Sequence, residues 1–237
     1  HQYLITALAI SPDGCWLASG SIDSKVYLWD VETHTARYCW PEKVDYLRGL
    51  TFSPDGQWLV VPGADGLVKF YAVTSGVLTY TLQCPSRQLC SVAFSPDGQW
   101  LAGGSSEGPI YLWSVATLTA TAPNSPWQCL PGHQGAVDTL LFSADSCSLY
   151  SGGHDPLIYR WDVHSLAANQ PAPDRPQLTL RGHHFYVRSL ALSPNGQCLA
   201  SGGADCTVRL WDVHSGALMD TLVGHDPWVW KVAFQPR

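Results

Sequence analysis

The sequence predicts an all-β fold built from short antiparallel strands. Three observations predict it. A turn of the Ser-Pro-Asp-Gly type recurs along the chain, apolar strand-like segments flank each copy of the turn, and Gly, Pro or Asp interrupts the chain roughly every 8 to 12 residues. A helix of ordinary length does not fit between breaks spaced so closely.

Composition and charge narrow the classes of function. The chain has 237 residues, of which 46% are apolar, enough for a substantial core, and only 14% are charged. Its net charge of −6 argues against nucleic-acid binding, which needs clustered Lys and Arg. No apolar run approaches the roughly 18 residues of a membrane helix, and no signal peptide is visible, so no membrane partner is expected.

The cysteines do not predict a metal site. Eight of them are scattered along the chain, with no CxxC pair and no close Cys/His cluster. Scattered thiols in a chain of this length fit a reducing compartment better than a disulfide framework. We therefore expect a cytoplasmic protein without a metal or another cofactor.

The recurring turn divides the chain into units. The turn reads SPDG at 11–14, 53–56 and 95–98, SADS at 143–146 and SPNG at 193–196, with spacings of 42, 42, 48 and 50 residues. Repeats of this length stack side by side in one domain. We expect one domain over 1–237 with units at approximately 1–42, 43–84, 85–132, 133–182 and 183–224, and a partial unit at 225–237.

Each unit reads as four strands, as the fifth unit illustrates. Its apolar-rich segments are 187–192, 199–202, 208–213 and 218–222, separated by turn residues. Nearly continuous apolar strands suit sheets that are covered on both faces.

Four polar or aromatic residues recur at fixed positions in the first, fourth and fifth units. A His, taken as position 0, is followed by Ser at +18, Asp at +22 and Trp at +28. The three sets are His1, Ser19, Asp23 and Trp29; His133, Ser151, Asp155 and Trp161; and His183, Ser201, Asp205 and Trp211.

This repeat resembles the WD-repeat family over essentially the whole chain, because the full His, Ser, Asp and Trp set occurs three times with Gly-His and Trp-Asp marks. The resemblance implies a β-propeller of four-stranded antiparallel blades whose loops present a rim to partner proteins. The chain would supply five complete blades and the first strand of a sixth, as a piece of a seven-bladed ring. A complete five-bladed ring is the alternative.

The His, Ser and Asp of each set also suggest a hydrolase triad. A nucleophilic site needs one activated Ser at one place, whereas this set recurs at identical spacing. A hydrogen-bonded chain from Trp through Ser and His to Asp would instead satisfy buried polar groups and tie the strands of one unit to its loop. We therefore expect a structural role for these residues, and no catalytic ones.

The second and third units depart from the set. Position +18 is Val61 in one and Gly103 in the other, and position 0 is Lys43 or Pro85. These units lose the polar network, so we expect them to depend on apolar packing and to be softer than the fifth.

Unrepeated residues are the better candidates for partner binding. Aromatic and Arg side chains, which protein-binding hot spots favour, occupy the variable positions beside the apolar +4 residue. The candidates are Tyr46, Arg48, Asp138, Tyr186, Arg188, Trp228 and Trp230. Two Arg beside aromatic anchors would suit a partner with acidic or phosphorylated groups.

The function that follows is a protein–protein interaction scaffold that binds a protein or peptide, with no small-molecule substrate. One alternative is a regulatory or sensor propeller of a larger signalling NTPase, kinase or protease. The copies SPDGQWL at 53 and again at 95 resemble recently duplicated arrays in bacterial, especially cyanobacterial, multidomain proteins. A propeller hydrolase is a weaker alternative, because no unique polar cluster and no GxxxxGK[ST] or HExxH motif is present.

Overall fold

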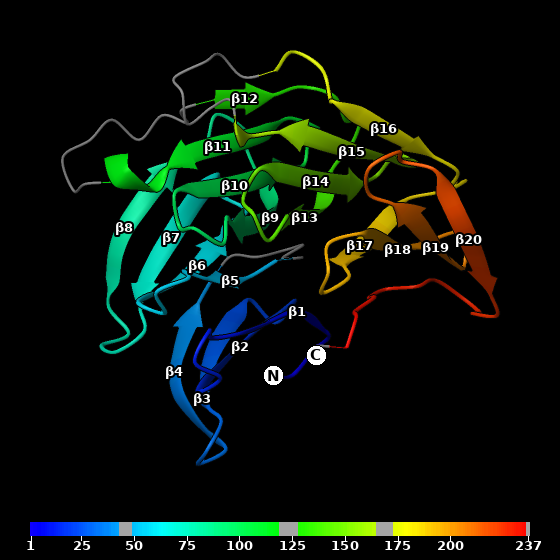
Figure 1. The fold of residues 1–237 in the computed structure, drawn as a ribbon. Helices are drawn as coiled ribbons and strands as arrows, with labels where there is room; N and C mark the ends of the chain where they lie inside the picture. Colours follow the sequence, from blue (N-terminus) through cyan, green and yellow to red (C-terminus); the bar gives the residue numbers. More distant parts are fainter. Residues whose placement is uncertain (43–48, 119–127, 165–172, 236–237) are drawn as a thin grey trace. The chain divides into compact units, whose positions relative to one another are not determined.

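A computed structural model of the chain describes residues 1–42, 49–118, 128–164 and 173–235. These residues form five four-stranded antiparallel sheets (Figure 1). Neighbouring strands in each sheet are also consecutive in the chain. The predicted all-β fold of four-stranded blades is confirmed. No helix among the described residues is long and apolar enough to cross a membrane.

Each sheet is one blade. Blade 1 holds β1 (Ile5–Ile10), β2 (Trp16–Ser21), β3 (Lys25–Asp30) and β4 (Thr35–Pro41). Blade 2 holds β5 (Thr51–Phe52), β6 (Trp58–Pro62), β7 (Leu67–Ala72) and β8 (Leu78–Gln83). Blade 3 holds β9 (Leu89–Phe94), β10 (Trp100–Ser105), β11 (Ile110–Ser114) and β12 (Gln128–Leu130), with the short 3₁₀ helix η1 (Val115–Thr117) after β11.

The last two blades have the same strand order. Blade 4 holds β13 (Val137–Phe142), β14 (Ser148–Gly153), β15 (Leu157–Asp162) and β16 (Leu178–Arg181). Blade 5 holds β17 (Val187–Leu192), β18 (Cys198–Gly203), β19 (Thr207–Asp212) and β20 (Leu218–Val223).

The recurring turn joins the first two strands of each blade by side-chain hydrogen bonds. In blade 1 the Ser11 hydroxyl donates to Asp13 Oδ1 at 2.5 Å, and Ser11 Oγ accepts from the Trp16 N–H at 2.8 Å. The fourth turn residue needs a positive φ, which glycine adopts without strain: Gly14 has φ 73°. In blade 4 a serine, Ser146, takes this conformation with φ 59°.

The described chain separates into two compact units, residues 1–106 with 110–128, and residues 107–109 with 129–237. Within the first unit, blades 1 and 2 share one apolar core that includes Leu28 and Leu59, and blades 2 and 3 share a second that includes Phe70 and Leu101. Within the second unit, blades 4 and 5 share a core around Trp211. Neighbouring blades in each unit are therefore held face to face by buried side chains.

The expected first strand of a sixth unit is not formed. Residues 224–235 carry no strand. Instead the Val229 N–H donates to the Gly203 carbonyl at 3.1 Å, the Val232 N–H donates to Ser189 Oγ at 3.2 Å, and the Val229 side chain is buried. The first strand of a blade normally pairs with the second strand of the same blade. The described residues 224–235 form no such pair and pack against blade 5 instead.

Candidate functional site

The structure joins the His, Ser, Asp and Trp of the first, fourth and fifth units in the same way; we call each group a tetrad. The Trp Nε1–H donates to Ser Oγ, the Ser Oγ lies beside His Nε2, and His Nδ1 lies beside the Asp carboxylate. The Trp–Ser distances are 2.8, 3.0 and 2.8 Å, the Ser–His distances 2.7, 2.8 and 2.7 Å, and the His–Asp distances 2.9 Å in each tetrad.

The direction of these hydrogen bonds follows from the chemistry of the groups. An ionised carboxylate only accepts, so the proton of a neutral imidazole lies on Nδ1 and Nε2 accepts from the serine hydroxyl. Ser19, Ser151 and Ser201 are all buried. A serine enclosed in this way has no access to a substrate carbonyl, which favours the structural role over a hydrolase triad.

The tetrad of blade 5 shifts the pKa of two members. Burial would raise the pKa of Asp205, but hydrogen bonds from the His184 N–H, Thr207 and His183 outweigh it and lower the pKa to about 2. Burial lowers the pKa of His183 below its usual value although Asp205 acts in the opposite direction. The arrangement therefore favours an ionised carboxylate beside a neutral imidazole.

Blade 2 lacks the tetrad but does not lack a polar network, which corrects the sequence-based expectation. The buried Glu42 accepts hydrogen bonds from the Tyr71 hydroxyl and from Lys69 Nζ, the latter at 2.5 Å. Tyr71 also packs on Trp40, with ring centroids 4.5 Å apart. Burial and then Glu42 raise the pKa of Tyr71 well above its usual value, so it stays a hydrogen-bond donor. A Tyr at +28 and a Glu from the previous unit replace the tetrad.

Blade 3 has no equivalent replacement around its Trp. The Trp113 ring lies over Gly103, where a Cβ atom would come within 2.8 Å of Trp113 Cζ3. The buried Trp113 Nε1 has no hydrogen-bond partner among the described residues. A hydrogen bond between Ser86 and Ser105, 2.7 Å long, ties the loop to β10 instead. In this blade the expected loss of the tetrad network is what the structure shows.

The predicted partner-binding residues of the second compact unit, which holds blades 4 and 5, gather around Arg188. Arg188 Nη1 donates to Asp138 Oδ2 at 2.7 Å and lies 3.2 Å from His154 Nε2, while His154 Nε2 lies 3.2 Å from the same Asp138 oxygen. The side chains of Arg188 and Asp138 are only 6% and 1% exposed. The Arg188 charge is therefore directed to a buried carboxylate and does not face a ligand.

Three aromatic rings surround the guanidinium of Arg188. Its Cζ lies 5.3 Å from the ring centroids of Tyr186 and Trp228 and 5.4 Å from that of Trp230. Tyr186 also stacks on His154 at 4.5 Å, with an interplanar angle of 11°. Distances under about 6 Å are in the range of cation–π attraction. Arg188 thus holds residues 228–230 against blade 5.

The aromatic rings themselves remain open to solvent. Tyr186 is 40% exposed, Trp228 45% and Trp230 59%. We call these three residues the aromatic surface. Exposed apolar side chains of this size are normal singly, but three around one buried ion pair form a contiguous apolar area on the surface of the unit.

Sequence reasoning found most of this cluster and missed one member. The structure brings together Asp138, Tyr186, Arg188, Trp228 and Trp230, whereas Tyr46 and Arg48 lie outside the described residues. The missed member is His154, which lies outside positions +3 and +5. Its position, +21, holds Ile, Ala or Ser in the other units, so the departure from the repeat was a usable signal.

Two further observations bear on the kind of site. Within the described ranges, no group of three or more His, Cys, Asp and Glu side chains is arranged to hold a metal ion. The chain as described also buries its repeated polar residues and exposes unrepeated aromatic ones. This arrangement is typical of a contact surface rather than of a reaction centre.

Comparison with known proteins agrees with the fold and the repeated residues. The family model described as WD domain, G-beta repeat matches residues 1–30, 40–71, 76–114, 124–162 and 174–212, which is more than half of the chain. A search of curated protein sequences found no significant match. Repeats of this family mediate protein–protein interaction and are generally non-catalytic. The chain belongs to the WD-repeat family.

Proposed function

We propose that this protein is an interaction scaffold and that the aromatic surface of its second compact unit binds a partner protein or peptide. The observation that carries the proposal is the exposure of Tyr186, Trp228 and Trp230 around a buried ion pair. Tyr and Trp supply large contact areas at a low entropic cost, which is why they are frequent binding hot spots.

The charge arrangement shapes the expected partner. Because Arg188 is paired with Asp138, it does not present a free positive charge to an acidic or phosphorylated group. A partner that buries apolar or aromatic side chains against the three rings fits better than the acidic one suggested by sequence. Arg188 is then a positioning residue, since it fixes the rings and leaves contact with the partner to them.

The test is capture of partners on the immobilised chain, identification by mass spectrometry, and titration of each purified partner. Tyr186→Ala and Trp230→Ala should each weaken a genuine partner at least about tenfold, which corresponds to about 1.4 kcal/mol. Tyr3→Ala is the matched control, because Tyr3 is a tyrosine of the first compact unit and is 67% exposed. Unchanged affinity of both variants would overturn the assignment of the surface.

A second proposal concerns the larger protein. The repeated heptapeptide SPDGQWL supports a recently duplicated array in a bacterial multidomain protein, in which the propeller would regulate a fused NTPase, kinase or protease. The sequence of the complete gene tests it directly. A signalling domain in the same reading frame is the expected finding, and an open reading frame that contains only WD repeats would contradict it.

We also propose a cytoplasmic location. None of the eight cysteines forms a disulfide, and Cys84 and Cys90 are buried. Reduced cysteines in this number fit a compartment that keeps thiols reduced. Thiol titration of protein purified without reductant from its native source should find eight reactive groups after denaturation, and fewer would contradict the location.

A further inference from the structure

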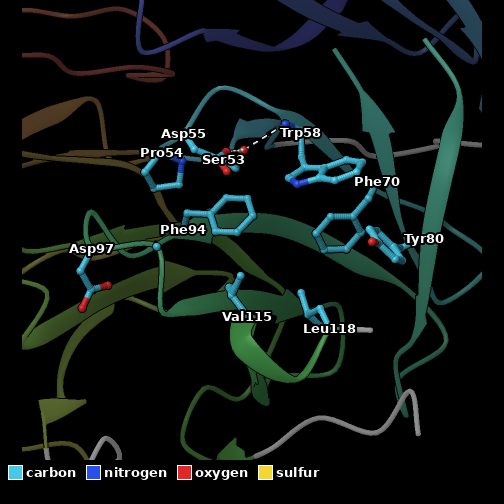
Figure 2. Close-up of a pocket in the computed structure, with 11 residues that line it drawn as sticks. Ser53, Pro54, Asp55, Trp58, Phe70, Tyr80, Phe94, Asp97, Val115 and Leu118 are labelled. Atoms are coloured by element: carbon cyan, nitrogen blue, oxygen red, sulfur yellow. Dashed lines mark hydrogen bonds between the residues drawn. The ribbon is translucent and has the colours of Figure 1, made fainter. Parts of the chain in front are cut away.

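The first compact unit contains a cavity of about 370 Å³ between blades 2 and 3 (Figure 2). Pockets for small ligands commonly have volumes of about 300–1,000 Å³. The cavity shares no residue with the aromatic surface of the second compact unit. It is therefore a separate feature, and its test does not depend on the function proposed above.

Aromatic rings form one end of the cavity. Trp58, Phe70 and Tyr80 gather there, with Phe94 facing them (Figure 2). The ring centroids of Trp58 and Tyr80 are 5.2 Å apart, edge to face, and those of Phe70 and Tyr80 are 6.2 Å apart. Val115 completes the apolar lining. This end suits an apolar side chain.

The cavity exists because the third unit departs from the repeat. Tyr38, Tyr80 and Leu178 occupy the same place on the outer strands of blades 1, 2 and 4, each opposite the +27 residue of its own unit. The side chains of Tyr38 and Leu178 are covered by the Ser-Gly turn of the next blade. A Cβ atom on Gly76 would lie 2.6 Å from the Tyr38 ring, and one on Gly216 would lie 2.7 Å from Leu178.

Among the described residues, no such turn covers Tyr80. In the third unit the Ser-Gly turn is replaced by η1, which begins at Val115. The Tyr38 hydroxyl, by contrast, donates to the Thr74 carbonyl at 2.8 Å, within the turn that covers it. Tyr80 instead lines the cavity beside Trp58. Within the part of the chain that the structure describes, the space that the repeat closes between blades 1 and 2 is a cavity between blades 2 and 3.

Two carboxylates lie at the other end of the cavity (Figure 2). They are Asp55 and Asp97, the third residues of two SPDG turns. Asp55 Oδ1 accepts from the Ser53 hydroxyl at 2.5 Å and from the Gln57 N–H at 3.0 Å, and Asp97 makes the same two bonds in its own turn. The described residues that line the cavity include these two carboxylates and no Lys, Arg or His, so this part of the lining is acidic.

From these contacts we propose that the cavity binds a peptide segment in which an apolar side chain is followed by Lys or Arg. The apolar side chain occupies the end formed by Trp58, Phe70 and Tyr80. The cationic group lies toward Asp55 and Asp97, where it gains charge-assisted hydrogen bonds.

The turn of the fifth unit supplies a variant that removes the charge without removing the turn. Asn195 takes the place of the aspartate there, and its Oδ1 still accepts from the Ser193 hydroxyl at 2.6 Å and from the Gln197 N–H at 3.2 Å. The double substitution Asp55→Asn with Asp97→Asn should therefore keep both turns while it removes two negative charges. Asp13→Asn is the matched control, because Asp13 makes the same bonds in the first unit and does not line the cavity.

In the experiment, the full chain carries ¹⁵N-labelled tryptophan and is titrated with N-acetyl-leucyl-argininamide. The indole N–H resonance of Trp58 reports binding and is assigned with the Trp58→Phe variant. The expected result is a saturable shift with a dissociation constant on the order of 1 mM. Affinity should fall at least about tenfold in the Asp55→Asn, Asp97→Asn protein and for the leucyl-glutaminamide and glycyl-argininamide probes, and stay unchanged in Asp13→Asn. No saturable shift of Trp58, or equal affinity in the doubly substituted protein, would overturn the proposal.

Discussion

Blades 3 and 4 build the same strand in two different ways. β10 and β14 are both buried along their whole length and pair in the same register with the strand that carries the Trp. In β14, Ser151 joins Trp161 to His133 by hydrogen bonds. In β10, Gly103 occupies the same position and the Trp113 ring covers it. The comparison teaches that apolar packing specifies the blade, and that the tetrad adds local stability to a fold that forms without it.

Blade 2 shows a third arrangement of the same interior. Val61 takes the place of the central serine, and Tyr71 takes the place of the Trp. The Tyr71 hydroxyl cannot reach a serine that is absent, so it donates to Glu42, which also binds Lys69. A buried network has therefore been rebuilt from different residues in blade 2, whereas the Trp113 N–H of blade 3 has none.

The largest expected effect comes from removing the central serine of a tetrad. Ser151→Ala leaves the buried Trp161 N–H and His133 Nε2 without their partner, so the free energy of unfolding should fall by about 2–4 kcal/mol. Urea denaturation followed by tryptophan fluorescence measures it. Ser75→Ala, in an exposed turn, is the control and should change stability by less than about 0.5 kcal/mol. A loss for Ser151→Ala as small as that of the control would break the comparison.

A smaller effect separates the two buried tryptophans. Trp161→Phe removes the hydrogen bond that the indole N–H donates to Ser151 Oγ, whereas Trp113→Phe removes an N–H that has no partner among the described residues. Both rings are buried, so the loss of packing is similar in the two variants. Trp161→Phe should therefore cost about 1–2 kcal/mol more than Trp113→Phe in the same denaturation measurement. Equal costs would show that the tetrad hydrogen bond contributes nothing net.

The smallest effect is a pH dependence of the tetrad in blade 5. The pKa of His183 is lowered in the folded protein, so its contribution to stability is present above the unfolded value of about 6.5 and is lost as pH falls through the folded value. The lowered pKa of Asp205 adds a second loss between about pH 4 and pH 2. Hydrogen exchange at pH 5 and pH 7.5, corrected for intrinsic rates, should show β18 weakened at the lower pH and β10 unchanged. Equal weakening of both strands would contradict this origin.

Much of the fold was predictable because the same sequence pattern recurs in several units. The three copies of His, Ser, Asp and Trp and the SPDG turns place strands at matching positions, and five units become five blades. The Glu42 network was not predictable in this way. Glu42 occupies the position before position 0, where the fourth and fifth units have Gly132 and Gly182, so only the folded structure shows that it reaches Tyr71.

The candidate site was partly predictable for a related reason. Variation at positions +3 and +5 identified Tyr186, Arg188 and Trp230 as unrepeated, but sequence position does not give the direction of a long side chain. Arg188 is directed to the buried Asp138 and is only 6% exposed, so the surface lacks the positive charge that the sequence predicts. The cavity beside Tyr80 also depends on a turn that is missing from one unit, and its volume follows only from packing.

The most direct test of the comparison is native-state hydrogen exchange of β10 and β14 in one sample. The two strands have the same length and the same complete burial, so they differ chiefly in the polar network around them. The account predicts that β10 amides exchange at least about tenfold faster than those of β14, because opening blade 3 breaks no tetrad, with β6 of blade 2 between them. Equal protection of β10 and β14 would contradict a stabilising role for the tetrad.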